Sequence, residues 1–234
     1  LSLSDLPTIR LRARQGRRVR SGAPWVFSNE IVMDAASKNL APGTLVRLSP
    51  EDDSAVLGTG YFNPKSLIAV RLLTRTNAKI DDEFFLGKLQ RALKLRERFY
   101  HAPFYRLVHA EADGLPGLVV DRFGDVCVAQ ITTAGMERVC DMLLQALDTM
   151  ISPKCVILRN DVNARTLEGL DLHVRTASGD PPERIAVEDA GIVAEDLDDG
   201  QIRNRAAVGE AAALEDGHRP PAQTSAELVE QARF

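Results

Sequence analysis

Residues 105–131 read YRLVHAEADGLPGLVVDRFGDVCVAQI, and this stretch decides the fold of the chain. Three apolar runs, at 107–108, 118–120 and 126–128, alternate with turn-forming residues at 113–114, 116–117 and 123–125. That pattern predicts a strand, a tight loop and then a β-hairpin. A sheet this apolar must bury a face against other elements.

Two amphipathic segments beside this stretch are expected to cover the sheet. Residues 81–100 begin with acids and end with cations, which complement a helix dipole, and residues 134–151 repeat apolar side chains at intervals of three and four. A buried strand over 154–158 and a helical turn over 163–168, closed by Gly169, follow. Residues 77–195 therefore predict one sheet with helices on one of its faces.

The first 76 residues carry shorter elements. Apolar and basic residues alternate over 8–14, and further strands are expected over 25–27, 44–48, 56–62 and 67–73, with Gly, Pro and Asn at the breaks. About five strands in so short a region predict a small barrel-like domain.

The pattern weakens after Ser178. A terminal hairpin is expected over 185–187 and 191–194. The acidic residues 196–234 have few large apolar side chains and are expected to form a disordered tail.

Composition and charge narrow the function. The apolar content of 44% and charged content of 26% are ordinary for a globular protein, and no apolar run approaches the roughly 18 residues of a membrane span. No secretory signal is recognised, so a cytoplasmic location is expected. The net charge of −4 conceals a gradient: residues 1–80 carry 12 Lys and Arg against 6 Asp and Glu, whereas residues 181–234 carry 5 against 12. A polyanionic partner is therefore expected for the N-terminal region only.

Four segments together resemble the bacterial 23S ribosomal RNA cytosine-C5 methyltransferases: SGAPWVFSNEI (21–31), GTGYFNPKSLIAVRLLTR (58–75), YRLVHAEADGLPGLVVDRFGDV (105–126) and LRNDVNARTLEGL (158–170). The resemblance runs from about Arg10 to Gly200. It implies an RNA-binding PUA domain, a central domain that shapes the substrate cleft, and a Rossmann-like domain that carries S-adenosylmethionine and the catalytic residues.

The first two of these parts match this chain. The predicted fold class is α+β: an N-terminal PUA-like pseudo-β-barrel over 1–76, a central α+β sheet-and-helix domain over 77–195, and an irregular acidic tail over 196–234. The resemblance implies S-adenosylmethionine as cofactor, but no binding site for it is found in this chain. A truncated chain, inactive alone, is therefore expected.

The residues that methyl transfer would need are not evident. Gly58-Thr-Gly60 precedes Phe62-Asn-Pro64 instead of a helix, so we interpret it as a strand bulge or a close backbone contact. The three cysteines lie in apolar runs without a neighbouring activator, which favours reduced, buried thiols over a nucleophile. The four histidines are scattered, and no metal site is expected. The cysteines are Cys127, Cys140 and Cys155.

Basic residues near the N-terminus give the strongest binding signal, because arginine matches phosphate in charge and in bidentate geometry. A strand over 8–14 would place Arg10, Arg12 and Arg14 on one face. Trp25 offers an aromatic surface, but its apolar neighbourhood favours the interpretation as a core residue over a stacking platform. The alternative for the whole cluster is a solvated basic face. The predicted RNA-binding residues are Arg14, Arg17, Arg18, Arg20, Lys65 and Arg71.

A second group of residues is predicted to border a cleft. Glu111 and Asp113 form a carboxylate pair suited to acid–base chemistry, or else Asp113 caps its turn and Glu111 pairs with an arginine. Arg159, Asp161 and Arg165 form either an internal ion-pair network or part of an RNA-facing cleft.

The leading hypothesis is an RNA-binding, substrate-recognition portion of a ribosomal RNA methyltransferase. The alternatives are a complete methyltransferase and a docking module for a separate catalytic subunit. Ribosomal RNA is the expected partner, without DNA or membrane, and a homodimer is a further expectation.

Overall fold

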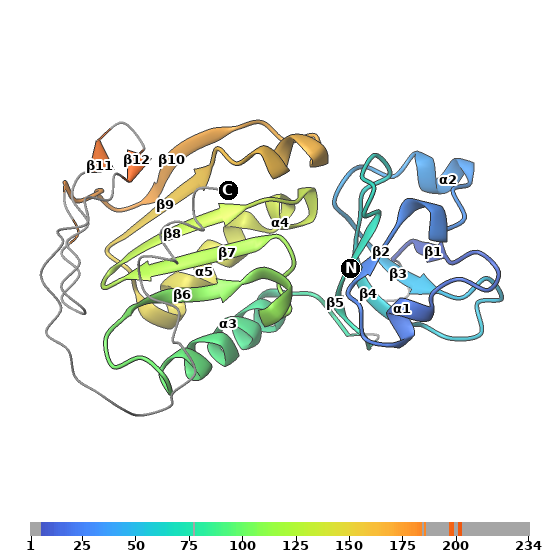
Figure 1. The fold of residues 1–234 in the computed structure, drawn as a ribbon, viewed down its shortest axis with the longest axis horizontal. Helices are drawn as coiled ribbons and strands as arrows, with labels where there is room; N and C mark the ends of the chain where they lie inside the picture. The colour runs from blue at the N-terminus through green and yellow to red at the C-terminus, as the bar shows by residue number, and fades with distance from the viewer. Residues whose placement is uncertain (1–5, 77, 184, 186–196, 199–200, 203–234) are drawn as a thin grey trace, which may run out of the picture.

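A computed structural model describes residues 6–76, 78–183, 185, 197–198 and 201–202. Within these residues the chain forms two units, each built on a five-stranded sheet (Figure 1). We call residues 6–76 the N-terminal unit and residues 78–183 the central unit. None of the helices in the described part of the chain is long and apolar enough to cross a membrane.

The N-terminal unit is a small sheet with short helical turns. Its strand order is β1-β3-β4-β5-β2, in which β1 runs parallel to β3 and the other pairs are antiparallel. The strands are β1 (Thr8–Arg10), β2 (Trp25–Val26), β3 (Thr44–Ser49), β4 (Gly58–Phe62) and β5 (Val70–Thr74). The helical turns are α1 (Arg17–Arg20), η2 (Ser28–Glu30) and α2 (Ala35–Lys38).

The predicted strands of this unit are found, with one substantial difference. The strand expected over 8–14 ends at Arg10 and is followed only by an isolated bridge between Leu11 and Ile31. Arg14 has a φ of 61°, in the left-handed region, and this residue turns the chain toward α1. The prediction that Arg10, Arg12 and Arg14 share one strand face is therefore wrong.

The central unit has the order β10-β9-β8-β7-β6. The pair β8–β9 is parallel, so the chain must cross over between these strands, and two helices make that crossover. The strands are β6 (Phe104–His109), β7 (Leu118–Phe123), β8 (Val126–Ile131), β9 (Cys155–Asn160) and β10 (His173–Ser178). The helices are α3 (Asp82–Arg96), α4 (Ala134–Arg138) and α5 (Cys140–Ile151), with 3-10 turns η3 (Ala110–Asp113) and η4 (Asn163–Glu168).

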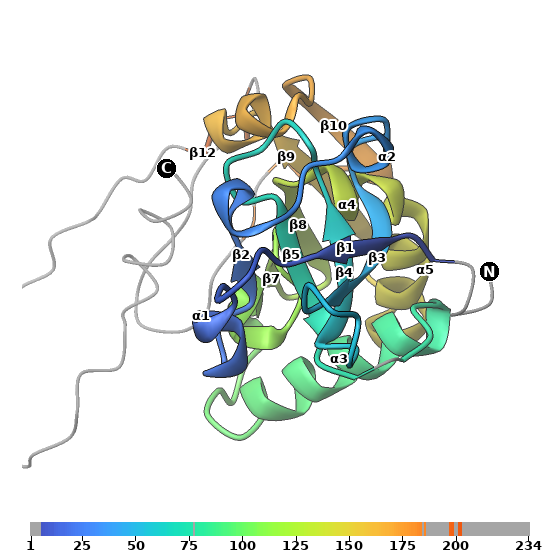
Figure 2. The same cartoon turned by 90° about the vertical axis from the view of Figure 1, so that its right-hand side faces the viewer.

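All three helices pack on one face of this sheet, as predicted (Figures 1 and 2). The core holds Phe85 and Leu89 from α3 and Leu143 from α5 against Leu107 and Val120 of the strands. The opposite face carries a smaller buried cluster of Val126, Cys155 and Ile157, with Ile185 packed against it.

Two details of the central unit differ from the prediction. The helix expected over 134–151 is two helices, because Val139 leaves helical geometry at φ −110° and ψ 14°. Strand β10 was not predicted: its residues are mostly exposed, and as an edge strand it pairs only with β9. Because neither face of β10 is buried, its sequence lacks the alternation of apolar and polar residues by which a strand is recognised.

Only a few residues of the predicted C-terminal elements are described by the structure. Apart from Ile185, the expected hairpin over 185–194 lies outside the described residues. Within the predicted tail, the structure describes only a short antiparallel pair, β11 (Leu197–Asp198) and β12 (Gln201–Ile202).

The two units are packed directly against each other. Tyr61 and Leu73 come from strands of the N-terminal unit but are buried in the core of the central unit. A Cβ atom on Gly135 of α4 would lie 2.0 Å from the Tyr61 ring, so only glycine allows this approach. The Tyr61 ring therefore packs the N-terminal unit directly against the start of α4.

Candidate nucleic-acid interface

A cluster of exposed arginines surrounds α1 on the N-terminal unit. Gly16 takes a left-handed conformation at the N-terminus of α1, and Val19 is the helix residue that enters the core. The other three α1 residues therefore face solvent. The cluster, which we call the α1 arginines, consists of Arg14, Arg17, Arg18 and Arg20, all exposed.

The α1 arginines have few internal partners. Arg20 donates from Nη1 to the backbone oxygen of Gln15 at 2.9 Å, and the Arg18 guanidinium lies 4.4 Å from the centre of the Phe27 ring. Among the described residues, none of the four forms an ion pair with a carboxylate. Their positive charge is therefore available to an anionic partner.

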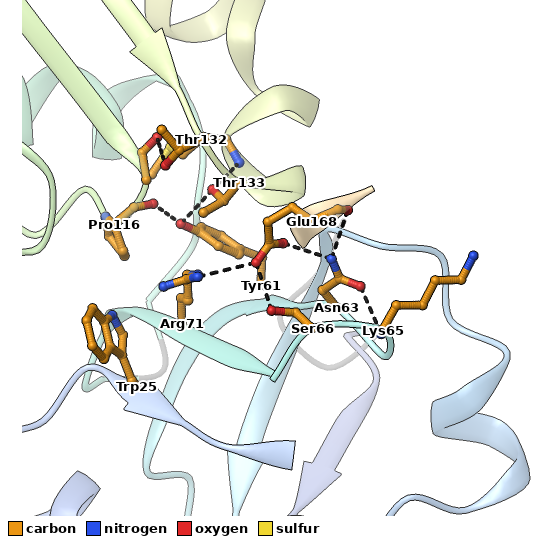
Figure 3. A network of polar contacts seen from close by, with 12 residues as sticks. Trp25, Tyr61, Asn63, Lys65, Ser66, Arg71, Pro116, Thr132, Thr133 and Glu168 are labelled. Atoms are coloured by element: carbon orange, nitrogen blue, oxygen red, sulfur yellow. Dashed lines mark hydrogen bonds and ion pairs between the residues drawn. The ribbon is translucent and has the colours of Figure 1, made fainter. Parts of the chain in front are cut away.

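The neighbouring basic residues are less available. Arg10 pairs with Asp53, Nε to Oδ2, at 2.6 Å, and Arg12 donates from Nε to the backbone oxygen of Ile31 at 2.8 Å. Lys65 is exposed in the loop between β4 and β5, and its side chain extends away from the contact between the units (Figure 3).

Arg71 is different, because it lies inside the contact between the two units. Its side chain is only 15% exposed, and its guanidinium faces Glu168 at 3.3 Å and Glu111 at 3.7 Å. Trp25 lies beside it, with 5.7 Å between the Arg71 guanidinium carbon and the ring centre, and donates from Nε1 to Glu111 at 2.7 Å. Trp25 is 37% exposed, so its interpretation as a core residue is wrong.

Glu168 is the centre of this contact (Figure 3). Its buried carboxylate accepts hydrogen bonds from Asn63 Nδ2 at 2.8 Å and Ser66 Oγ at 2.9 Å, in addition to Arg71. The Glu168 backbone oxygen also accepts from Asn63, at 3.2 Å. One acid at the end of η4 thus binds one side chain from β5 and two from the loop between β4 and β5.

Tyr61 forms the second part of the contact. Its hydroxyl donates to the backbone oxygen of Pro116 and accepts from Thr133 Oγ1 at 3.2 Å. Burial raises the pKa of the Tyr61 hydroxyl well above its usual value, so it remains a neutral donor. The same Thr133 caps the first turn of α4, which links the contact to the central core.

The predicted cleft residues are all engaged in ion pairs. Asp113 is held by both terminal nitrogens of Arg96, at 2.8 and 2.7 Å. The Arg165 side chain, 2% exposed, donates from Nη1 to Glu137 at 2.8 Å. Asp161 has the most exposed side chain of the five, at 39%, and its carboxylate accepts a hydrogen bond from Arg159 at 3.0 Å. Glu111 and Asp113 therefore do not act as an isolated carboxylate pair in this conformation.

The described residues offer no thiol suited to nucleophilic attack. Cys127, Cys140 and Cys155 are free and buried, as predicted. Burial raises the pKa of Cys127 to about 11 and also raises the pKa values of the other two thiols. Thiolate, the reactive form, is therefore scarce at neutral pH.

The Gly-rich segment does not fit a methyl-donor loop either. Gly58-Thr59-Gly60 lies within β4, every residue of which is buried. A Cβ atom on Gly60 would lie 2.2 Å from the backbone oxygen of Arg71 on the adjacent strand. The prediction of a close backbone contact is confirmed. In the described ranges, no group of three or more His, Cys, Asp or Glu side chains could hold a metal ion.

Comparison with known proteins identifies the N-terminal unit. Residues 9–75 match the PUA-like domain family. This chain contains a PUA-like domain. The prediction of such a domain is therefore confirmed.

The longer similarity extends through the central unit. The chain is 31% identical over 195 residues to ribosomal RNA large subunit methyltransferase I from Alteromonas mediterranea, which covers 81% of this chain and 48% of the relative. The proteins of the same name from Shewanella denitrificans and Escherichia coli are 37% identical over 190 residues and 35% identical over 175 residues. These two matches cover 79% and 72% of this chain, and 47% and 43% of the relatives. The chain thus spans about half the length of the curated relatives it matches.

Solved structures share the fold. A Streptococcus mutans protein assigned as a SAM-dependent methyltransferase superposes with a TM-score of 0.63 at 17% identity, covering 80% of this chain and 47% of the other. SMU.776, assigned as a methyltransferase and solved with SAH, gives a TM-score of 0.68 at 18% identity, covering 84% and 50%. At these identities the likeness concerns the fold alone.

Proposed function

We propose that this chain binds ribosomal RNA through its α1 arginines, as the RNA-recognition portion of a S-adenosylmethionine-dependent ribosomal RNA (cytosine-C5) methyltransferase. The observation that carries the proposal is the α1 cluster itself: four exposed guanidinium groups without a carboxylate partner among the described residues, on a PUA-like domain. Guanidinium groups bind phosphate by charge and by paired hydrogen bonds, so such a cluster suits an RNA backbone. The similarity to ribosomal RNA methyltransferases supports RNA as the polyanion.

The proposal divides the work between the two units. Residues 1–76 hold the RNA, and residues 77–195 supply the platform on which they are fixed by Glu168 and Tyr61. Arg71 serves this contact, and Lys65 adds a cation at the edge of the N-terminal unit. Of the predicted cleft residues, we retain Arg159 and Asp161 for a substrate contact, because Asp161 stays exposed. The partner is cytoplasmic ribosomal RNA rather than DNA or a membrane.

The first experiment measures RNA affinity against salt concentration. Replacing Arg17, Arg18 and Arg20 together by Ala removes three charges, so the slope of log affinity against log salt should fall by about 2 to 3. The control replaces Lys38, Lys154 and Arg175 by Ala, which makes the same change in net charge elsewhere on the surface. Equal affinity and equal slope in the two triple variants would remove the α1 arginines from the proposal.

We propose further that the described residues do not themselves transfer a methyl group. The supporting observations are the buried thiols with raised pKa values and the enclosed position of the only GxG segment in the sequence. The test incubates this chain with labelled S-adenosylmethionine and unmodified ribosomal RNA. No label should enter the RNA, and transfer by this chain alone would contradict this part of the proposal while leaving RNA binding intact.

A further inference from the structure

Helix α3 has a second ordered face beside the one that enters the core. The buried face repeats at intervals of four and three through Phe85, Leu89 and Ala92. One residue earlier, the same spacing runs through Phe84, Lys88, Arg91 and Leu95 and reaches Arg98 just beyond the helix. Side chains at these intervals lie on one side of a helix. We call this second face the α3 stripe: Phe84, Lys88, Arg91, Leu95 and Arg98.

The cations of the α3 stripe have no acidic partner among the described residues, in contrast to Arg96 of the same helix, which is bound by Asp113. Lys88 lies 5.4 Å from the centre of the Phe84 ring. Burial lowers the pKa of Lys88, and the charge of Arg91 lowers it further. No neighbouring carboxylate raises that pKa, so the positive charge of the stripe is not neutralised within the described part of the chain.

Exposed apolar side chains gather at the C-terminal end of the stripe. Leu95 is 44% exposed, Phe99 is 73% exposed and Tyr100 is 40% exposed. These three residues lie within six positions, although the described chain has only nine large apolar side chains with such exposure. Tyr100 is held against Tyr105, with 5.2 Å between ring centres, while Phe99 is left free on the surface. A single exposed apolar side chain is ordinary, but a group of them so close together in the sequence marks an interaction surface.

The combination of cations unpaired within the described residues and exposed aromatic rings, on α3 and just beyond it, points to single-stranded RNA as the ligand. Surfaces that bind single strands combine cations that follow the phosphates with aromatic rings on which bases stack. Arg91 and Arg98 supply the charge, and Phe99 with Tyr100 supplies the rings. Helix α3 begins next to the N-terminal unit and runs away from it for about 22 Å (Figure 1). An RNA gripped by the PUA-like domain can therefore continue along it.

The geometry points to the α3 stripe, together with Phe99 and Tyr100, as a second RNA contact that holds a single-stranded segment next to the structure bound by the PUA-like domain. This inference rests on the proposed RNA-binding function. It assigns phosphates to Arg91 and Arg98 and a stacked base to Phe99. The occupant is an RNA strand, because an apolar protein partner would not explain the unpaired cations along the whole face.

The test compares two RNAs: a ribosomal RNA stem-loop, and the same stem-loop with single-stranded extensions at both ends. Replacing Arg91 and Arg98 by Ala should lower the salt slope by about 1.4 for the extended RNA and leave the stem-loop alone unaffected. The matched control replaces Lys154 and Arg175 by Ala, which removes two exposed cations from other surfaces. Arg175 lies on β10, at the sheet edge opposite the strand that α3 contacts.

Stacking is tested separately. Phe99→Ala should weaken binding of the extended RNA by at least about fivefold. Leu167→Ala removes an equally exposed apolar side chain, 76% exposed, and should leave affinity unchanged. Photo-crosslinking with 5-iodouridine in the extensions should attach RNA to the peptide that contains Phe99 and Tyr100.

The outcomes separate this inference from the proposed function. If Arg91→Ala/Arg98→Ala behaves like its control while the triple α1 variant still loses affinity, the second contact is refuted and the proposed function stands. If the unmodified chain binds neither RNA, the proposed function is refuted, and the second contact that rests on it is refuted as well. If Phe99→Ala abolishes self-association in sedimentation and leaves RNA affinity unchanged, the stripe is a protein interface and the inference is overturned.

Discussion

The α1 arginines and the internal arginines of the same chain differ in exposure and in their partners. The first are exposed and have no carboxylate partner among the described residues. The second have side chains between 2% and 15% exposed, and each faces at least one acid. Whether an arginine is available to RNA therefore depends on whether the fold brings a carboxylate to it. The internal arginines are Arg71, Arg96, Arg106 and Arg165.

This difference has energetic consequences. A buried ion pair gains little over an apolar pair, but removing one partner leaves an uncompensated buried charge and is strongly destabilising. An exposed cation without a partner contributes little to stability. By the proposed function, the α1 arginines contribute to RNA affinity instead. Stability and RNA affinity should therefore respond to different arginines.

The largest effect on stability is expected at Arg165. Its Nη1 donates to the backbone oxygen of Ile131 and to Glu137, and its Nε donates to the backbone oxygen of Asp171 at 2.8 Å. Arg165→Ala leaves these acceptors without a donor and should lower the free energy of unfolding by about 3 kcal/mol, the lower end of the range for buried pairs because Glu137 is partly exposed. Urea denaturation measures the change.

Arg175→Ala is the control for this variant, because Arg175 is an exposed arginine on β10. Its effect should stay within about 0.5 kcal/mol. If both variants lose the same stability, burial is not what distinguishes the two classes of arginine.

The second largest effect is expected at Glu168. Glu168→Ala removes the acceptor of Asn63, Ser66 and Arg71 together, so the free energy of unfolding should fall by about 2 kcal/mol. Scanning calorimetry should also show less cooperative unfolding, since the contact between the two units is weakened. Glu97→Ala, at an exposed acid, supplies the control. A single transition at the original temperature would show that Tyr61 and the apolar contacts suffice.

The sequence predicts the elements of this fold far better than the roles of its arginines. The two long amphipathic segments and the central strands follow from apolar periodicity, which is local. The partner of Arg71 is 97 residues away, that of Arg165 is 28 residues away, and that of Arg96 is 17 residues away. No local sequence pattern predicts which residues so far apart will pair. From the sequence alone, Arg71 therefore cannot be distinguished from the α1 arginines. Strand β10 was missed for the related reason that an exposed edge strand has no apolar face.

Arg159 is intermediate between the α1 arginines and the internal arginines, because it is partly exposed and has a carboxylate partner. Its side chain is 20% exposed, and its hydrogen bond lowers the pKa of Asp161 below the usual value. A lowered folded-state pKa means that the pair stabilises the fold above the unfolded-state pKa of Asp and that this stability is lost as the pH falls through the folded-state pKa. Arg159→Ala should therefore cost about 0.5 kcal/mol at neutral pH and less as the pH falls through that acid range.

The titration of Asp161, followed by nuclear magnetic resonance, checks this prediction directly. Its pKa should rise when Arg159 is replaced, because the hydrogen bond that lowers it most is removed. Asp125, which pairs with Lys154 at a separate site, should titrate unchanged. An unaltered Asp161 pKa would mean that Arg159 does not pair with Asp161 in solution and belongs with the α1 arginines.

The smallest effect on stability is expected from the α1 arginines themselves. Replacing Arg17, Arg18 and Arg20 by Ala keeps Val19 in the core and introduces a residue with a higher helix propensity, which offsets the loss of the Arg18 contact with Phe27. The free energy of unfolding should change by no more than about 0.5 kcal/mol, while RNA affinity falls. Urea denaturation and RNA titration on the same preparation give both numbers. A variant that loses stability in proportion to affinity would place these arginines with the internal ones, because their loss of binding would then follow from a damaged fold.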